Sequence, residues 1–134
     1  MADATSLAVN TLVANGTKAI TVDVNTAATG ARTLAIDVGG LSDRIALRLK
    51  NNGTDATNTL SVTLSAGTNP PAFRAGIGAF TKTGLATAST TIFGPVETAR
   101  FIGTDGKLSV IIASDGATNA AAIWEACVYK LPIV

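Results

Sequence analysis

The sequence predicts an all-β fold, an antiparallel two-sheet sandwich that is jelly-roll-like and has about nine strands. Turn dipeptides recur about every ten residues, a spacing typical of sandwiches and barrels. Between the turns, apolar and polar residues alternate with a period of two, and helical periodicity is nearly absent. The 134 residues form a single predicted domain, 1–134.

The first predicted hairpin turns at Asn15-Gly16. This dipeptide favours a two-residue type I′ turn, whose central residues both need a positive φ. Pairing outward from the turn places Val13 opposite Lys18 and Val9 opposite Val22. The apolar residues of both strands then share one face, and a slip of one residue would scatter them.

A second hairpin is predicted at Asp105-Gly106 by the same argument. Its register places Phe101 opposite Val110 and Ala99 opposite Ile112. Period-two alternation predicts the other strands, at 33–38, 44–50, 59–65, 90–93 and 121–131. Gly94-Pro95 is expected to close the strand at 90–93. The last strand is apolar on both faces, and its register stays open.

The segment from about 66 to 88 is predicted to be a long loop, because Pro70 and Pro71 exclude a central strand there. Long loops in compact domains are usually functional or disordered. This one carries four candidate partner-binding residues: Phe73, Arg74, Phe80 and Lys82. The phenylalanines could fill pockets on a partner while the cations meet acidic groups. The alternative is that both phenylalanines fold back on the sandwich as a lid.

A second candidate binding surface is the basic strand face formed by Arg44, Arg48 and Lys50. Their two-residue spacing places them together, where they could meet an acidic partner. The alternative is a solvated face whose charge prevents pairing of sheet edges. No aromatic residue interleaves with these cations, as nucleic-acid binding would require.

The inventory of reactive residues argues against catalysis and bound cofactors. The chain has no histidine and one cysteine, which excludes Ser-His-Asp and Cys-His nucleophiles, His-ligated metals and an internal disulfide. Its nine acidic residues are scattered, without a calcium-binding motif. We therefore expect no enzyme activity, no catalytic residue, no metal and no cofactor, and we expect Cys127 to be a buried, inert thiol.

Charge and hydropathy favour a protein that works in contact with others. Charged residues make up 14% and the net charge is +1, which argues against nucleic-acid binding through phosphates. The N-terminus lacks the pattern of a signal peptide, and no apolar run is long enough to span a membrane. Low charge and an apolar last strand predict a closed homo-oligomer, with a trimer favoured.

Three segments resemble a known group of proteins: TIFGPVETARF at 91–101, DGKL at 105–108 and VYKLP at 128–132. In these segments the chain resembles the small β-rich head proteins of tailed bacteriophages, which decorate or cement the capsid. The resemblance covers roughly residues 90–132 and consists of turn and strand patterns. It implies a non-enzymatic virion protein that is made in the host cytoplasm, is oligomeric on the capsid surface and binds the major capsid protein.

Two functional hypotheses follow. The first is a structural virion protein that decorates or cements a bacteriophage capsid. The second is a receptor- or glycan-binding β-sandwich module of a fibre or adhesin. Few aromatic residues, 4% of the chain, and the absence of a signal peptide favour the first.

Overall fold

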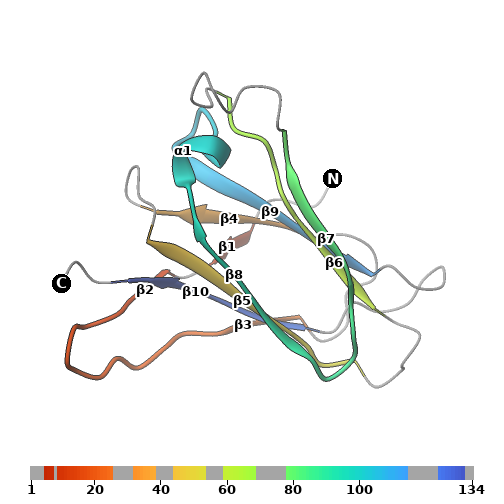
Figure 1. The fold of residues 1–134 in the computed structure, drawn as a ribbon, viewed down its shortest axis with the longest axis horizontal. Helices are drawn as coiled ribbons and strands as arrows, with labels where there is room; N and C mark the ends of the chain where they lie inside the picture. Colours follow the sequence, from red (N-terminus) through yellow and green to blue (C-terminus); the bar gives the residue numbers. More distant parts are fainter. Residues whose placement is uncertain are drawn as a thin grey trace.

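A computed structural model shows a sandwich of two five-stranded sheets (Figure 1). It describes residues 5–7, 9–25, 32–38, 44–53, 59–68, 78–114 and 124–131. The first sheet has the spatial order β1 (Thr5–Leu7), β4 (Arg32–Asp37), β9 (Lys107–Ser114), β6 (Leu60–Leu64) and β7 (Phe80–Leu85). The second has the order β2 (Val9–Thr11), β10 (Trp124–Lys130), β5 (Ile45–Asn51) and β8 (Thr90–Val96), with β3 (Asp23–Asn25) also pairing with β10. A one-turn helix, α1 (Thr98–Phe101), follows β8.

The predicted two-sheet, all-β sandwich is confirmed, but its sheets are mixed. β1 joins β4 in parallel and β2 joins β10 in parallel, whereas the other pairings between described strands are antiparallel. Consecutive described strands change sheets, except from β2 to β3 and from β6 to β7. The predicted core strands at 33–38, 44–50 and 59–65 correspond to β4, β5 and β6.

The core lies between the two sheets and follows from period-two alternation. In β6, Leu60, Val62 and Leu64 are buried while Ser61 and Thr63 are half-buried. In β9, Val110 and Ile112 lie at the centre of the first sheet and are fully buried. Apolar burial of this kind is the dominant favourable contribution to folding.

β10 is buried on both faces, in agreement with its apolar pattern. Trp124, Ala126 and Val128 point into the core. Cys127 therefore points to the outer face of the sheet, yet it is 0% exposed, and the neighbouring Ala46 is also buried.

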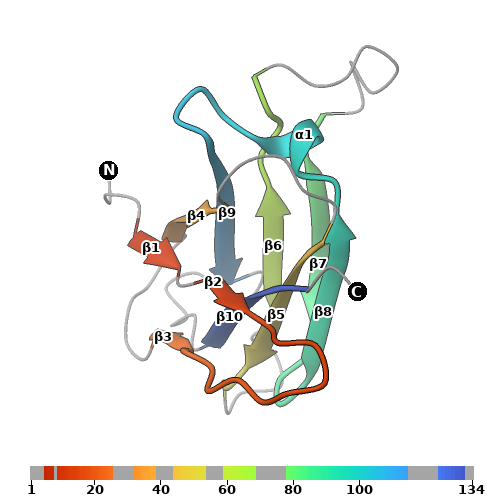
Figure 2. The same ribbon diagram turned by 90° about the vertical axis from the view of Figure 1, so that its left-hand side faces the viewer.

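Residues 12–22, here called the arm, lie on this outer face. In Figure 2 the arm passes in front of the second sheet, and in Figure 1 it runs below β10 and β5. The buried side chain of Asn10 fixes it: Nδ2 donates to the carbonyls of Thr21 (3.1 Å) and Val128 (3.0 Å), and the Thr21 N–H donates to Oδ1 (2.7 Å). The second apolar face of the last strand is thus accommodated by the chain itself, and it no longer argues for an oligomer.

The predicted first hairpin is wrong in its pairing and in its turn, whose central residues are Ala14 and Asn15 and not Asn15 and Gly16. Asn15 has a φ of 55°, and the Gly16 N–H donates to the Val13 carbonyl at 3.3 Å. The flanking segments do not form the predicted ladder. Instead, β2 pairs with β10 along Val128–Lys130 and β3 pairs with β10 along Trp124–Ala126. One edge of β10 accommodates both short strands, so the arm between them is left without a ladder.

The second hairpin is also corrected. Its turn has a φ of +76° at Gly106, and the Gly103 N–H donates to the Lys107 carbonyl at 2.9 Å. However, the predicted partners of Val110 and Ile112, Phe101 and Ala99, lie in α1. A single bridge between Ile102 and Leu108 remains, because β4 and β6 occupy both edges of β9.

Two further boundaries differ from the predictions. β8 continues through Gly94-Pro95 to Val96 and does not end at Phe93. The predicted loop at 66–88 contains β7, which pairs with β6, so the segment is not one continuous loop. A strand fits after residue 79 because both prolines lie earlier, at 70 and 71.

Candidate functional site

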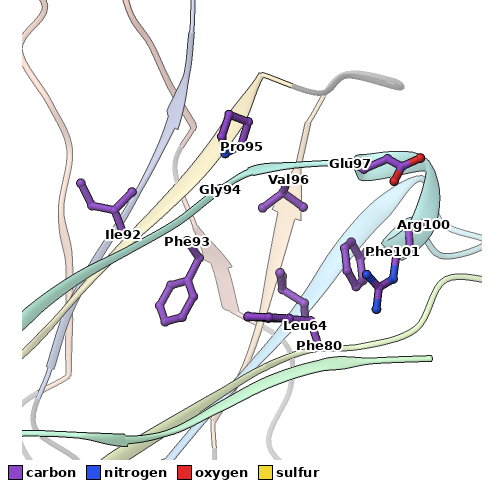
Figure 3. Close-up of a pocket in the computed structure, with 10 residues that line it drawn as sticks. All are labelled: Leu64, Phe80, Ile92, Phe93, Gly94, Pro95, Val96, Glu97, Arg100 and Phe101. Carbon is purple, nitrogen blue, oxygen red and sulfur yellow. The ribbon is translucent and has the colours of Figure 1, made fainter. Parts of the chain in front are cut away.

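A pocket of about 380 Å³ opens where β7 and β8, the edge strands of the two sheets, meet α1 (Figure 3). We call it the edge pocket. Its volume lies within the range typical of small-ligand sites, roughly 300–1,000 Å³. The pocket lies here because β7 and β8 are edge strands, and α1, which directly follows β8, borders its opening.

The interior of the edge pocket is apolar. Leu64, Phe93, Val96 and Phe101 line it and are themselves buried. Phe80 stands at the mouth, 41% exposed, with its ring 6.2 Å from that of Phe93 in an edge-to-face arrangement. Such aromatic pairs add modestly to the burial of their area. Phe80 thus forms part of the wall and still presents apolar surface to solvent.

Ile92 is at the edge of the pocket, but its side chain points away from the side chains of Phe80 and Phe93 (Figure 3). It is 62% exposed, the largest exposure among the big hydrophobic side chains that the structure describes, and it lies on the outer face of the second sheet, opposite Arg48.

Arg100 supplies a positive charge to the pocket from α1. Its guanidinium carbon lies 4.7 Å from the centre of the Phe101 ring, a cation–π contact, and Nη2 donates to the Gly78 carbonyl at 3.3 Å. Nε is buried and has no hydrogen-bond partner among the described residues. A buried donor without an acceptor is unfavourable, so this atom is suited to an incoming oxygen.

A close backbone contact holds α1 in place. The Gly67 N–H donates to the Arg100 carbonyl at 3.0 Å, and the Thr68 N–H donates to the Ile102 carbonyl at 3.1 Å. A Cβ at position 67 would lie 2.7 Å from both carbonyl oxygens. Glycine is required here by close approach rather than by φ, and the position of Arg100 depends on it.

The candidate residues of the predicted long loop are partly brought to the pocket. Phe80 lines it, and Lys82 lies exposed on the same strand, β7. The lid alternative holds for Phe80 only in part, because the ring packs on Phe93 while remaining exposed. Phe73 and Arg74 lie outside the described residues.

The candidate basic face lies on the second sheet and not at the pocket. Arg44 is exposed just before β5, whereas Arg48 and Lys50 are half-buried within it. Their neighbours are mixed in character: Lys50 lies opposite Glu125, and Arg48 lies opposite both Cys127 and Ile92. The structure therefore places an acidic and an apolar residue among the predicted cations.

Cys127 and Tyr129 lie on the same outer face, two residues apart in β10. The pKa of Tyr129 is raised above 10.0, mainly by a side-chain hydrogen bond with Cys127 and secondly by burial, while the nearby charge of Arg48 acts in the opposite direction. Cys127 is a buried free thiol, which confirms its predicted burial.

Arg100 is the charged pocket residue of most interest that sequence reasoning missed. The predicted hairpin placed Ala99 and Phe101 in a strand, and Arg100 was not singled out as a candidate. The sequence does contain one signal for this residue: Arg100 directly precedes the aromatic Phe101, a few residues after Gly94-Pro95.

Within the described ranges, no group of three or more Cys, Asp or Glu side chains is placed to hold a metal ion. No helix among these residues is long and apolar enough to cross a membrane. Comparison with protein-family models, curated proteins and solved structures finds no match to this chain.

Proposed function

We propose that this chain is a non-enzymatic virion protein that decorates or cements a bacteriophage capsid by docking its edge pocket on the major capsid protein. The observation that carries the proposal is the exposed ring of Phe80 at the mouth of a preformed apolar pocket. Buried aromatic anchors that fill or flank pockets dominate the energetics of protein interfaces. The resemblance of residues 90–132 to phage head proteins covers both β8 and α1.

In this proposal the protein acts on the capsid surface as a closed homo-oligomer, with a trimer favoured. Support now comes from the exposed aliphatic side chains of the arm and β3, namely Val13, Ile20 and Val24. Closed symmetric assembly would bury these side chains without open polymerisation. The protein would be made in the host cytoplasm before it joins the particle.

The second candidate function is a receptor- or glycan-binding module of a fibre or adhesin. The aromatic lining of the edge pocket favours it, because three phenylalanines (Phe80, Phe93 and Phe101) surround a space of ligand size. Such a module would bind its target without any affinity for capsids.

Sedimentation with capsids tests the proposal. We expect Phe80→Ser to weaken binding of the purified protein to capsids at least tenfold, about 1.4 kcal/mol, because it removes an apolar anchor at the mouth. Thr83→Ala, an exposed change on the same strand, is the matched control and should bind like the wild type. Circular dichroism verifies that both variants fold. Equal capsid binding by folded Phe80→Ser and wild-type protein would exclude the edge pocket as the docking site.

A further inference from the structure

We infer that the edge pocket recognises an extended, acidic segment of its protein partner, in which one large apolar side chain enters the pocket and a nearby carboxylate pairs with Arg100. This inference rests on the proposed function, since it takes the partner to be a protein. It adds the chemistry by which that partner is selected.

The apolar half of the site accepts one large side chain. Its walls, Leu64, Val96 and Phe101, are fixed in the core, so they are preformed for binding. A space of about 380 Å³ accommodates a phenylalanine- or leucine-sized group with room to spare. Preformed walls reduce the entropy lost on association.

The charged half of the site is the guanidinium of Arg100. Stacking on Phe101 and the bond from Nη2 to Gly78 hold its plane, while Nε lacks an acceptor among the described residues. A carboxylate can accept hydrogen bonds from two guanidinium nitrogens at once, which are among the strongest in proteins. Arg100 is thus oriented for a carboxylate that approaches along the pocket.

Glu97 does not occupy this position. It lines the same end of the pocket, but in Figure 3 its carboxylate extends away from the aromatic side chains, whereas Arg100 reaches along Phe101 towards them. Glu97 also has an interaction of its own. The negative charge of Glu97 repels a second carboxylate near it, so the carboxylate of the partner is expected on the Arg100 side of the pocket.

The edge strands beside the mouth favour a peptide over a small free acid. Among the described strands, β7 pairs with β6 alone and β8 pairs with β5 alone. An extended segment can add to such an edge through backbone hydrogen bonds, while alternate side chains enter pockets. Residues two apart in that segment share a face, so an apolar residue and an acid at this spacing would reach the pocket together.

The test is an NMR titration in which the amide chemical shifts of the ¹⁵N-labelled full chain are followed as each of two pentapeptides, capped at both ends, is added. One has phenylalanine and glutamate two positions apart, and the other has glutamine in place of glutamate. We expect the glutamate peptide to bind about tenfold more tightly, with shifts at Phe93, Gly94 and Phe101, because a charge-assisted bond is lost with glutamine. Arg100→Gln should remove this preference, and Lys18→Gln, a change of an exposed cation in the arm, should retain it.

Equal affinity for the two peptides, or shifts confined to other surfaces, would overturn the inference. The two peptides are compared on the wild-type protein, so this test can be made even if Arg100→Gln does not fold. Phenylpropionate is the third probe. If it binds as tightly as the glutamate peptide, the pocket is a small-acid site and the peptide inference is wrong. A selective peptide site in a protein that ignores capsids would instead refute the proposed function alone.

Discussion

Trp124→Ala is expected to lower the free energy of unfolding by about 3–5 kcal/mol, the largest single effect in the molecule. Trp124 is 2% exposed and belongs to the core between the sheets. Its removal would leave a cavity that the neighbouring strands, held by the β10–β5 ladder, cannot easily fill. Small domains have a total stability of only about 5–15 kcal/mol, so this variant should lose a large share of it.

Trp124→Phe is the matched control. The indole Nε1 is buried without a hydrogen-bond partner among the described residues, so its loss removes an unfavourable group while most of the apolar contact remains. We expect a cost of at most about 2 kcal/mol. Urea unfolding followed by circular dichroism measures both variants, since the single tryptophan is no longer available as a fluorescent probe. A loss below about 1 kcal/mol for Trp124→Ala would contradict the position of β10 in the core.

Gly67→Ala is expected to destabilise the protein by about 1–3 kcal/mol, the range for overpacked sites. Its Cβ would lie 2.7 Å from the carbonyl oxygens of Arg100 and Ile102, and backbone atoms cannot move aside as a flexible side chain can. The two hydrogen bonds that join residues 67–68 to α1 would lengthen as a result. The same unfolding measurement tests this.

Gly103→Ala serves as its control. The nearest atom to a Cβ at this position is a side-chain oxygen of Asp105, at 3.1 Å, which can move by a small rotation. Its stability should stay within about 1 kcal/mol of the wild type. If Gly67→Ala were as stable as this control, the contact that positions α1 and Arg100 would not exist as described.

The strands that depend on local alternation could be predicted from the sequence. β4 and β6 are buried at every second residue, through Leu34 and Ile36 in one and Leu60, Val62 and Leu64 in the other. Each lies with one face on the core, and this is the situation in which a period of two reports burial directly.

The hairpins failed because their pairing is decided by a third strand. The register argument for residues 9–22 considered two strands in isolation, but β10 pairs with both short strands and Asn10 binds the arm by its side chain. For α1, Ala99 and Phe101 have the alternation of a strand. Contacts from Gly67 and Thr68, more than thirty residues away, accompany the helical turn that forms there.

The candidate site was predicted only in part. Phe80 was identified as a large apolar residue near a proline-rich segment, and it does line the edge pocket. Arg100 was missed because its role depends on α1. The basic residues Arg48 and Lys50 were correctly placed on one face of β5, but the residues opposite them in β10 and β8 could not be known.

The composition of purified virus particles tests the central claim most directly. Particles banded in a density gradient, from a culture that expresses this chain, are washed at high salt and analysed by gel electrophoresis and mass spectrometry. The account predicts that the chain stays with the particles at a fixed, stoichiometric ratio to the major capsid protein. Its absence from intact washed particles, or a trace amount that varies between preparations, would contradict a structural role in the virion.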